Sequence, residues 1–331
     1  TINWGDGSVE DGTLSAAGSS GSISGTHLYD DDGFFSVTIC VTDKDTASGC
    51  DTLDVIVKNI SPTTTLDTTD SVALTADGPS FFISQANASQ TRSATGTDIG
   101  SDDLTFTWTW GDGVVLQNTH YNNGSTADGR PPANRGAVAP FSATDTVSHT
   151  YAAAGSYILS VQLSDDDGDS GQPPTSATIP TLITDKQDCV MTIGFWQHQF
   201  NPETRKPQVD HLSLQSYLSL INTASDVFSE VLAASTRTDA WLLLQPEDTS
   251  ETTIQGQAME QVLATWLNFA WGAVGWDDSI PDLGRPWHQV MADIEATFLN
   301  PHASHTDYVR ANDLAVSINE MDAKRKACKK G

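Results

Sequence analysis

The sequence predicts two antiparallel β-sandwiches, the first incomplete at its N-terminal end, followed by a C-terminal, mainly α-helical domain. Three observations support this class: a strand-and-turn motif occurs twice, apolar residues alternate after each copy, and the apolar period changes to about 3.6 beyond Cys189. A chain of 331 residues is long enough for two or three cores of ordinary size. We expect domains at residues 1–60, 61–186 and 187–331.

The repeated motif begins with Trp-Gly-Asp-Gly, at Trp4 and again at Trp110. A His-x-Tyr motif follows in each copy, at His27 and at His149, and a glycine then precedes an apolar stretch. Gly-Asp-Gly is typical of a tight turn between antiparallel strands, because glycine tolerates positive φ and aspartate bonds its own backbone. Two copies in the same order predict tandem domains.

The stretch after each His-x-Tyr motif alternates with period two, which predicts a strand with one buried face. The alternating residues are Phe35, Val37, Ile39 and Val41 in the first copy and Tyr157, Leu159, Val161 and Leu163 in the second. The first copy lacks the strands that should precede its turn, so upstream residues or a neighbouring chain would have to supply them. The second copy contains residues 116–146, rich in Asn, Gly and Pro, which we expect to be an inserted surface loop.

Helical spacing dominates the third domain. One helix face is predicted by Met259, Val262, Leu263, Trp266, Leu267 and Ala270. Further helices are expected at residues 212–221, 226–234, 238–244, 287–298 and 306–321, with Pro286 at a helix start. Six of the nine tryptophans lie in this domain, and we interpret them as core residues rather than as a ligand surface.

The charge balance is strongly acidic, with 43 Asp and Glu against 16 Lys and Arg and a net charge of -27. Such a chain repels nucleic acid and anionic membrane surfaces, so neither is an expected partner. Divalent cations are the natural counterpart of clustered carboxylates. No run of eighteen apolar residues occurs, so we expect no membrane span.

Aspartate-rich loops make calcium the expected cofactor, because calcium binds several oxygen ligands on short flexible loops. The candidate ligands are Asp43, Asp45, Asp98, Asp102, Asp103, Asp165, Asp167 and Asp169, and a further cluster is Asp30-Asp31-Asp32. The loops around Asp98 and Asp165 are the best candidates. The alternative is that these carboxylates satisfy turn backbones without a metal, the role we assign to Asp6 and Asp112 in the Gly-Asp-Gly turns.

The four cysteines predict two disulfides: Cys40 with Cys50 across a hairpin, and Cys189 with Cys328 at the ends of the helical region. Zinc ligation would need closer spacing such as Cys-x-x-Cys, which is absent, so an oxidising extracellular or cell-surface location is favoured. The chain also lacks recognisable nucleophile and phosphate-binding motifs. We therefore expect that it is not an enzyme.

The two turn motifs, their His-x-Tyr partners and the Asp-rich loops after the strands resemble polycystic kidney disease (PKD) domains. The resemblance covers residues 1 to about 182 and includes residues 97–106 and the linker at residues 57–63. It implies immunoglobulin-like sandwiches that act as spacers and that occasionally bind calcium. Residues 189–198 and 266–273 resemble the GYWKNH-type domain of bacterial surface proteins, with Phe195 and Gln197 in place of its Tyr and Lys.

The sequence therefore predicts an extracellular structural protein, a calcium-stabilised surface or filament subunit that mediates self-association or adhesion. Addition of a β-strand from a neighbouring copy is the expected mode of self-association. The alternative is a non-catalytic accessory region of a secreted hydrolase, which would bind a surface polymer.

Overall fold

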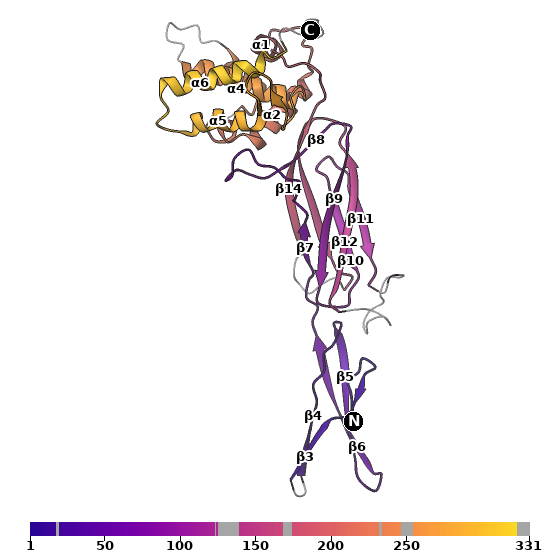
Figure 1. The fold of residues 1–331 in the computed structure, drawn as a ribbon. Helices are drawn as coiled ribbons and strands as arrows, with labels where there is room; N and C mark the ends of the chain where they lie inside the picture. The colour runs from indigo at the N-terminus through magenta and orange to yellow at the C-terminus, as the bar shows by residue number, and fades with distance from the viewer. Residues whose placement is uncertain are drawn as a thin grey trace.

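The computed structural model describes residues 1–17, 20–122, 124, 139–167, 174–231, 234–245 and 254–322. Within them, two β domains and a helical domain follow one another along an elongated molecule, with the helices at one end (Figure 1). The structure thus has the predicted class: β domains followed by a mainly α-helical domain. No helix in the described ranges is both long and apolar enough to cross a membrane.

The first β domain contains a four-stranded antiparallel sheet in the order β2-β1-β5-β6. Its strands are β1 (Ile2–Asn3), β2 (Val9–Glu10), β5 (Gly33–Thr42) and β6 (Ser48–Val57). A separate hairpin consists of β3 (Thr13–Ala17) and β4 (Ser20–Ser24). Phe35 and Val37 are buried as the alternation predicts, whereas Val41, near the end of β5, is 49% exposed. Among the described residues of this domain, the buried hydrophobic side chains are Ile2, Phe35 and Val37, so its core is small.

The second β domain is a complete sandwich of two sheets, in the orders β11-β10-β13-β14-β8 and β12-β9-β7. The larger sheet contains β8 (Phe82–Gln85), β10 (Leu104–Thr109), β11 (Val115–His120), β13 (Gly155–Ser164) and β14 (Thr175–Thr184). The smaller sheet contains β7 (Thr63–Leu66), β9 (Ser89–Asp98) and β12 (Phe141–Thr150). Its core includes Phe106, Trp108, Trp110, Leu159 and Val161, all fully buried.

The loop expected at residues 116–146 is shorter than predicted. Strand β11 pairs with β10 up to His120, and β12 pairs with β9 from Phe141 onward. Residues of β11 are largely exposed, so the strand is held mainly by its backbone hydrogen bonds and has no apolar face for a periodicity argument to detect. Residues 125–138 of the expected loop lie outside the described residues.

The helical domain is built around α4, which is buried along most of its length and contacts α1, α2, α3 and α6. Its elements are α1 (Ile193–Phe200), α2 (His211–Ala224), a π-helical turn η1 (Val227–Val231), α3 (Arg237–Leu244), α4 (Ile254–Ala270), the hairpin of β15 (Ser279–Ile280) and β16 (Arg285–Pro286), α5 (Trp287–Leu299) and α6 (His305–Asn319). Trp196, Trp266 and Trp287 are fully buried, in agreement with the expected core role.

The second sandwich and the helical domain share one apolar core. Leu74 and Phe81, from the connection between β7 and β8, are buried in the same cluster as the helical residues. The ring of Phe81 packs edge-on against Trp276, with centroids 5.5 Å apart. Leu182, near the end of β14, belongs to this cluster as well, so the helices pack against one end of the sandwich (Figure 1).

Candidate metal centre between the two β domains

Three loops meet where the first β domain adjoins the second. They are the segment before β5 with Asp30, Asp31 and Asp32, the β9–β10 loop, and the loop that follows β13. The amide of Ser101 donates to the carbonyl oxygen of Asp30 at 2.9 Å. The side-chain amide of Asn59, in the linker, donates to Asp165 Oδ2 at 2.9 Å. These two bonds hold the carboxylates of both domains close to one another.

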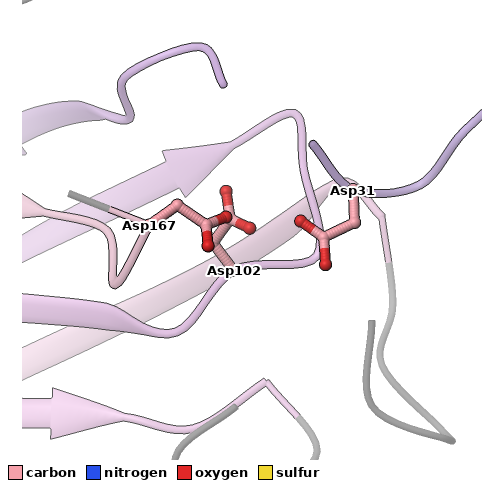
Figure 2. A group of neighbouring side chains, drawn as sticks. All are labelled: Asp31, Asp102 and Asp167. Carbon is pink, nitrogen blue, oxygen red and sulfur yellow. The ribbon is translucent and has the colours of Figure 1, made fainter. Parts of the chain in front are cut away.

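Five of these aspartates form two overlapping groups. Asp31, Asp102 and Asp167 form one group, and Asp98, Asp102 and Asp165 form the other. In each group, one carboxylate oxygen per residue lies within 4.8 Å of the others. Figure 2 shows Asp31 reaching toward the adjoining carboxyl groups of Asp102 and Asp167. The first group therefore spans the junction between the domains, whereas the second lies wholly within the second sandwich.

Two of the carboxyl groups that the second sandwich contributes are buried, whereas Asp165 and Asp167 are half-buried. Asp98 is 1% exposed and Asp102 is 4% exposed. Asp98 Oδ1 accepts a hydrogen bond from the amide of Gly100 at 2.8 Å, but Asp98 Oδ2 has no hydrogen-bond partner among the described residues. Burying a neutral polar group without a hydrogen bond costs of order 2–7 kcal/mol. Burying an ionised carboxylate without a donor or a cation costs more. The described protein atoms therefore leave this buried carboxylate oxygen without a partner that offsets the cost of its burial.

The titration of the cluster reflects this environment. Burial, followed by interaction with Asp167, raises the pKa of Asp102 to about 10. Burial likewise raises the pKa of Asp32 to about 6, again with repulsion from Asp167. The pKa values of Asp31 and Asp98 are also raised, with burial as the largest cause. A bound cation would reverse this effect, because it favours the ionised form of every neighbouring carboxylate.

The donor set fits a hard divalent cation. Calcium takes six to eight oxygen ligands at about 2.3–2.6 Å in flexible geometry, and magnesium demands a smaller, near-octahedral site. Each of the five aspartates of the two groups offers carboxylate oxygens, and they come from three different loops. Neither group includes a histidine or cysteine, so this donor set suits calcium better than zinc or copper.

The other predicted ligands lie elsewhere. Asp43 and Asp45 are in the turn between β5 and β6, at the end of the hairpin remote from the second domain (Figure 1). Asp43 Oδ1 accepts from the amides of Asp45 and Ala47 at 2.8 and 2.9 Å, and Asp45 pairs with the adjacent lysine. This is the turn-satisfying role that was the alternative to calcium binding. Asp103 belongs to neither group, and its Oδ1 accepts from the amide of Asn122 at 2.7 Å.

Asp169 lies outside the described residues. Asp31 enters the site, although it comes from the further Asp30-Asp31-Asp32 cluster and not from the loops expected to be the best candidates. The Asp30-Asp31-Asp32 run was visible in the sequence as one more acidic loop. Nothing in a linear pattern indicates that this loop faces Asp102 across a domain boundary, because the juxtaposition depends on how the two domains are joined.

The predicted disulfide between Cys40 and Cys50 is present, and it links paired positions of β5 and β6. Cys189 is also disulfide-bonded. Its expected partner, Cys328, lies outside the described residues.

No protein-family model matches this chain, and no curated protein matches it. Among solved structures, it is similar to the PKD domain of an M14-like peptidase from a Thermoplasmatales archaeon, with 16% identity and a TM-score of 0.24, over 38% of this chain and 97% of that one. It is also similar to the PapD-like domain 7 of human CEP192, with 8% identity and a TM-score of 0.20, over 32% of this chain and 81% of that one.

Proposed function

We propose that this protein is a non-catalytic, extracellular structural subunit, stabilised by calcium, that associates with further copies of itself at a cell surface or in a filament. The observation that supports this proposal most directly is that β6 lies at the edge of the first domain's sheet, with no further strand beside it within the described residues. The disulfide of that domain and the net charge of -27 agree with a location outside the reducing cytosol and with cations as stabilising ions.

Comparison with the second sandwich identifies the strand edge that is unpaired in the first domain. Hairpins β5–β6 and β13–β14 pair equivalently, Gly33 opposite Val57 and Gly155 opposite Ile183. The outer edge of β14 pairs in parallel with β8. The corresponding edge of β6 has no strand beside it within the described residues.

The apolar surface of β6 supports the same proposal. Leu53 pairs with Val37 across the sheet, so both side chains lie on one face. Val37 is buried, whereas Leu53 is 61% exposed. A strand added along β6 would satisfy the free backbone groups of this edge and cover Leu53.

Self-association of the whole chain in calcium tests the proposal. We expect light scattering to show concentration-dependent oligomers, and we expect Leu53→Lys to abolish them because a lysine on an edge opposes strand addition. Leu212→Lys is the matched control, since Leu212 is 82% exposed on α2, away from this edge. Monomers at all concentrations, or equal association of both variants, would refute the proposal. Monomers that sediment with chitin, cellulose or collagen would instead support the accessory, polymer-binding alternative.

A further inference from the structure

We propose that a calcium ion bridges the two β domains by binding Asp31 of the first together with Asp102 and Asp167 of the second, beside a second calcium ion bound by Asp98, Asp102 and Asp165. This inference rests on the proposed calcium-stabilised structural role and names the place and the consequence of binding. Filling the bridging site fixes the angle between the two β domains.

The first step of the argument is the unpartnered oxygen of Asp98. Acidic clusters are common at the ends of β-sandwiches, and an exposed cluster indicates little by itself. Asp98, however, is 99% buried, and its Oδ2 has no donor within the described part of the chain. An oxygen removed from water in this way lacks a positive partner, and a cation shared with Asp102 and Asp165 supplies one.

The second step is that no basic side chain among the described residues forms an ion pair with the cluster. None of the ion pairs formed by the described residues involves any of the five carboxylates. Lys58 lines the adjoining pocket together with Asp31 and Asp102, but it is exposed and takes part in none of these ion pairs. Within the described part of the chain, five carboxylates from two domains therefore face one another without forming an ion pair with a basic side chain, which favours capture of a divalent ion.

The third step is the position of Asp102 in both groups. A carboxylate has two oxygens, so one aspartate can ligate two neighbouring ions. The ion held by Asp98 and Asp165 would fix the positions of Asp102 and of the residues directly after β13 within the second sandwich. Asp102 and Asp167 are then presented to Asp31, so the bridging ion binds to a preformed half-site.

The fourth step is the weakness of the junction without an ion. Direct polar contacts there include the Ser101 to Asp30 backbone bond and the Asn59 to Asp165 side-chain bond. Ionisation of several of these aspartates at once would add a repulsion that opposes these contacts. The bridging ion changes this repulsion into attraction, so the first domain is held in one orientation when calcium is bound and moves more freely when it is removed.

Calcium titration of the whole chain tests the proposal, with calorimetry for stoichiometry and spin labels on the two β domains for distances between them. We expect two ions per chain and a distance distribution that narrows with calcium. Asp31→Asn is expected to lose one ion, or to weaken its binding at least about tenfold, and to leave the distribution broad. Asp167→Asn should behave in the same way. Asp54→Asn, an equal charge change on β6 away from both groups, should match the unmodified chain.

Thermal unfolding provides a test in which the melting temperature is expected to change differently in chelator and in calcium. A variant that merely misfolds would have a lower melting temperature in both. Asp98→Asn removes a buried unpaired charge, so it should raise or maintain the melting temperature in chelator and lower it in calcium, relative to the unmodified chain. Two ions bound normally by Asp31→Asn, or distances that calcium leaves unchanged in the unmodified chain, would overturn the inference. The proposal of self-association would still be supported in that case if association were lost in Leu53→Lys. The two proposals can therefore be refuted independently of each other.

Discussion

The imidazole Nε2 of His149 lies 2.8 Å from Asp112 Oδ2, and His27 and Asp6 repeat this relationship in the first domain at 2.6 Å. The other oxygen of each aspartate accepts the amide two residues later in its turn, at 3.1 and 2.8 Å respectively. Each histidine ring also stacks on the tryptophan of its own turn motif. The two separated motifs of each repeat are therefore one structural unit, which fastens the turn to the segment before β5 in the first domain and to β12 in the second. Asp6 and Asp112 bond their turn backbones, as expected.

Replacing His149 tests this unit. His149→Ala removes the bond to Asp112 and the stacking on Trp110, whose ring centroid is 4.6 Å away. We expect a loss of about 1–3 kcal/mol in the free energy of unfolding, measured by denaturant titration. His211→Ala provides the control, because His211 is exposed at the start of α2. Equal stability of the two variants would show that the histidine does not fasten the turn.

The buried Glu295 predicts a pH dependence of the helical domain. Its Oε1 accepts from Trp266 Nε1 at 2.7 Å and from the hydroxyl of Ser225, and burial, the largest cause, raises its pKa from 4.5 to about 7. Because the folded pKa is raised, its protonation stabilises the fold fully below pH 4.5, and this contribution is lost as pH rises through about 7. The difference amounts to about 3 kcal/mol.

Glu295→Gln should therefore flatten the melting temperature between pH 4 and pH 8, because the amide does not titrate over this range. The exposed Glu203 supplies the control, and Glu203→Gln should retain the full slope. Calorimetric melting curves at several pH values measure both. A slope unchanged in Glu295→Gln would mean that another group carries the dependence.

A substitution at Gly272 tests how closely the helical domain approaches the second sandwich. Its φ is +75°, and an added Cβ would lie 1.8 Å from the carbonyl oxygen of Asp185, just after β14. Gly272→Ala should cost about 2 kcal/mol or more, since it adds a backbone clash to the strain of positive φ. Gly284 has a φ of +62° but open space around its Cβ position, so Gly284→Ala should cost only about 1 kcal/mol. Equal losses in thermal unfolding would contradict the close approach.

Local patterns predicted much of the helical domain. The expected helix at residues 287–298 is α5, Trp287–Leu299, and that at residues 306–321 is α6, His305–Asn319. The prediction at residues 226–234 corresponds only to the short π-helical turn η1. Amphipathic spacing and capping residues such as Ser304 are local signals, so they can be recognised in the sequence without knowledge of the fold.

Long-range contacts were the part that patterns missed. Strand β11 is built of largely exposed residues, and it is a strand because β10 lies beside it. Phe81 and Leu74 come from an irregular connection, yet they complete the core under the helices. In both cases the stabilising partner is remote in sequence, and periodicity carries no information about it.

The sequence by itself determined the tandem turn motifs, the one-sided burial of β5 and β13, the helical nature of the last domain and the Cys40–Cys50 pair, because each depends on residues that are close in the chain or repeated at a fixed order. Only the tertiary structure decided which acidic loops converge. Asp43 was separated from the site and Asp31 was brought to Asp102, because carboxylates in different domains meet only through the angle at which the domains are joined. That angle depends on the linker and junction contacts, which no single segment encodes.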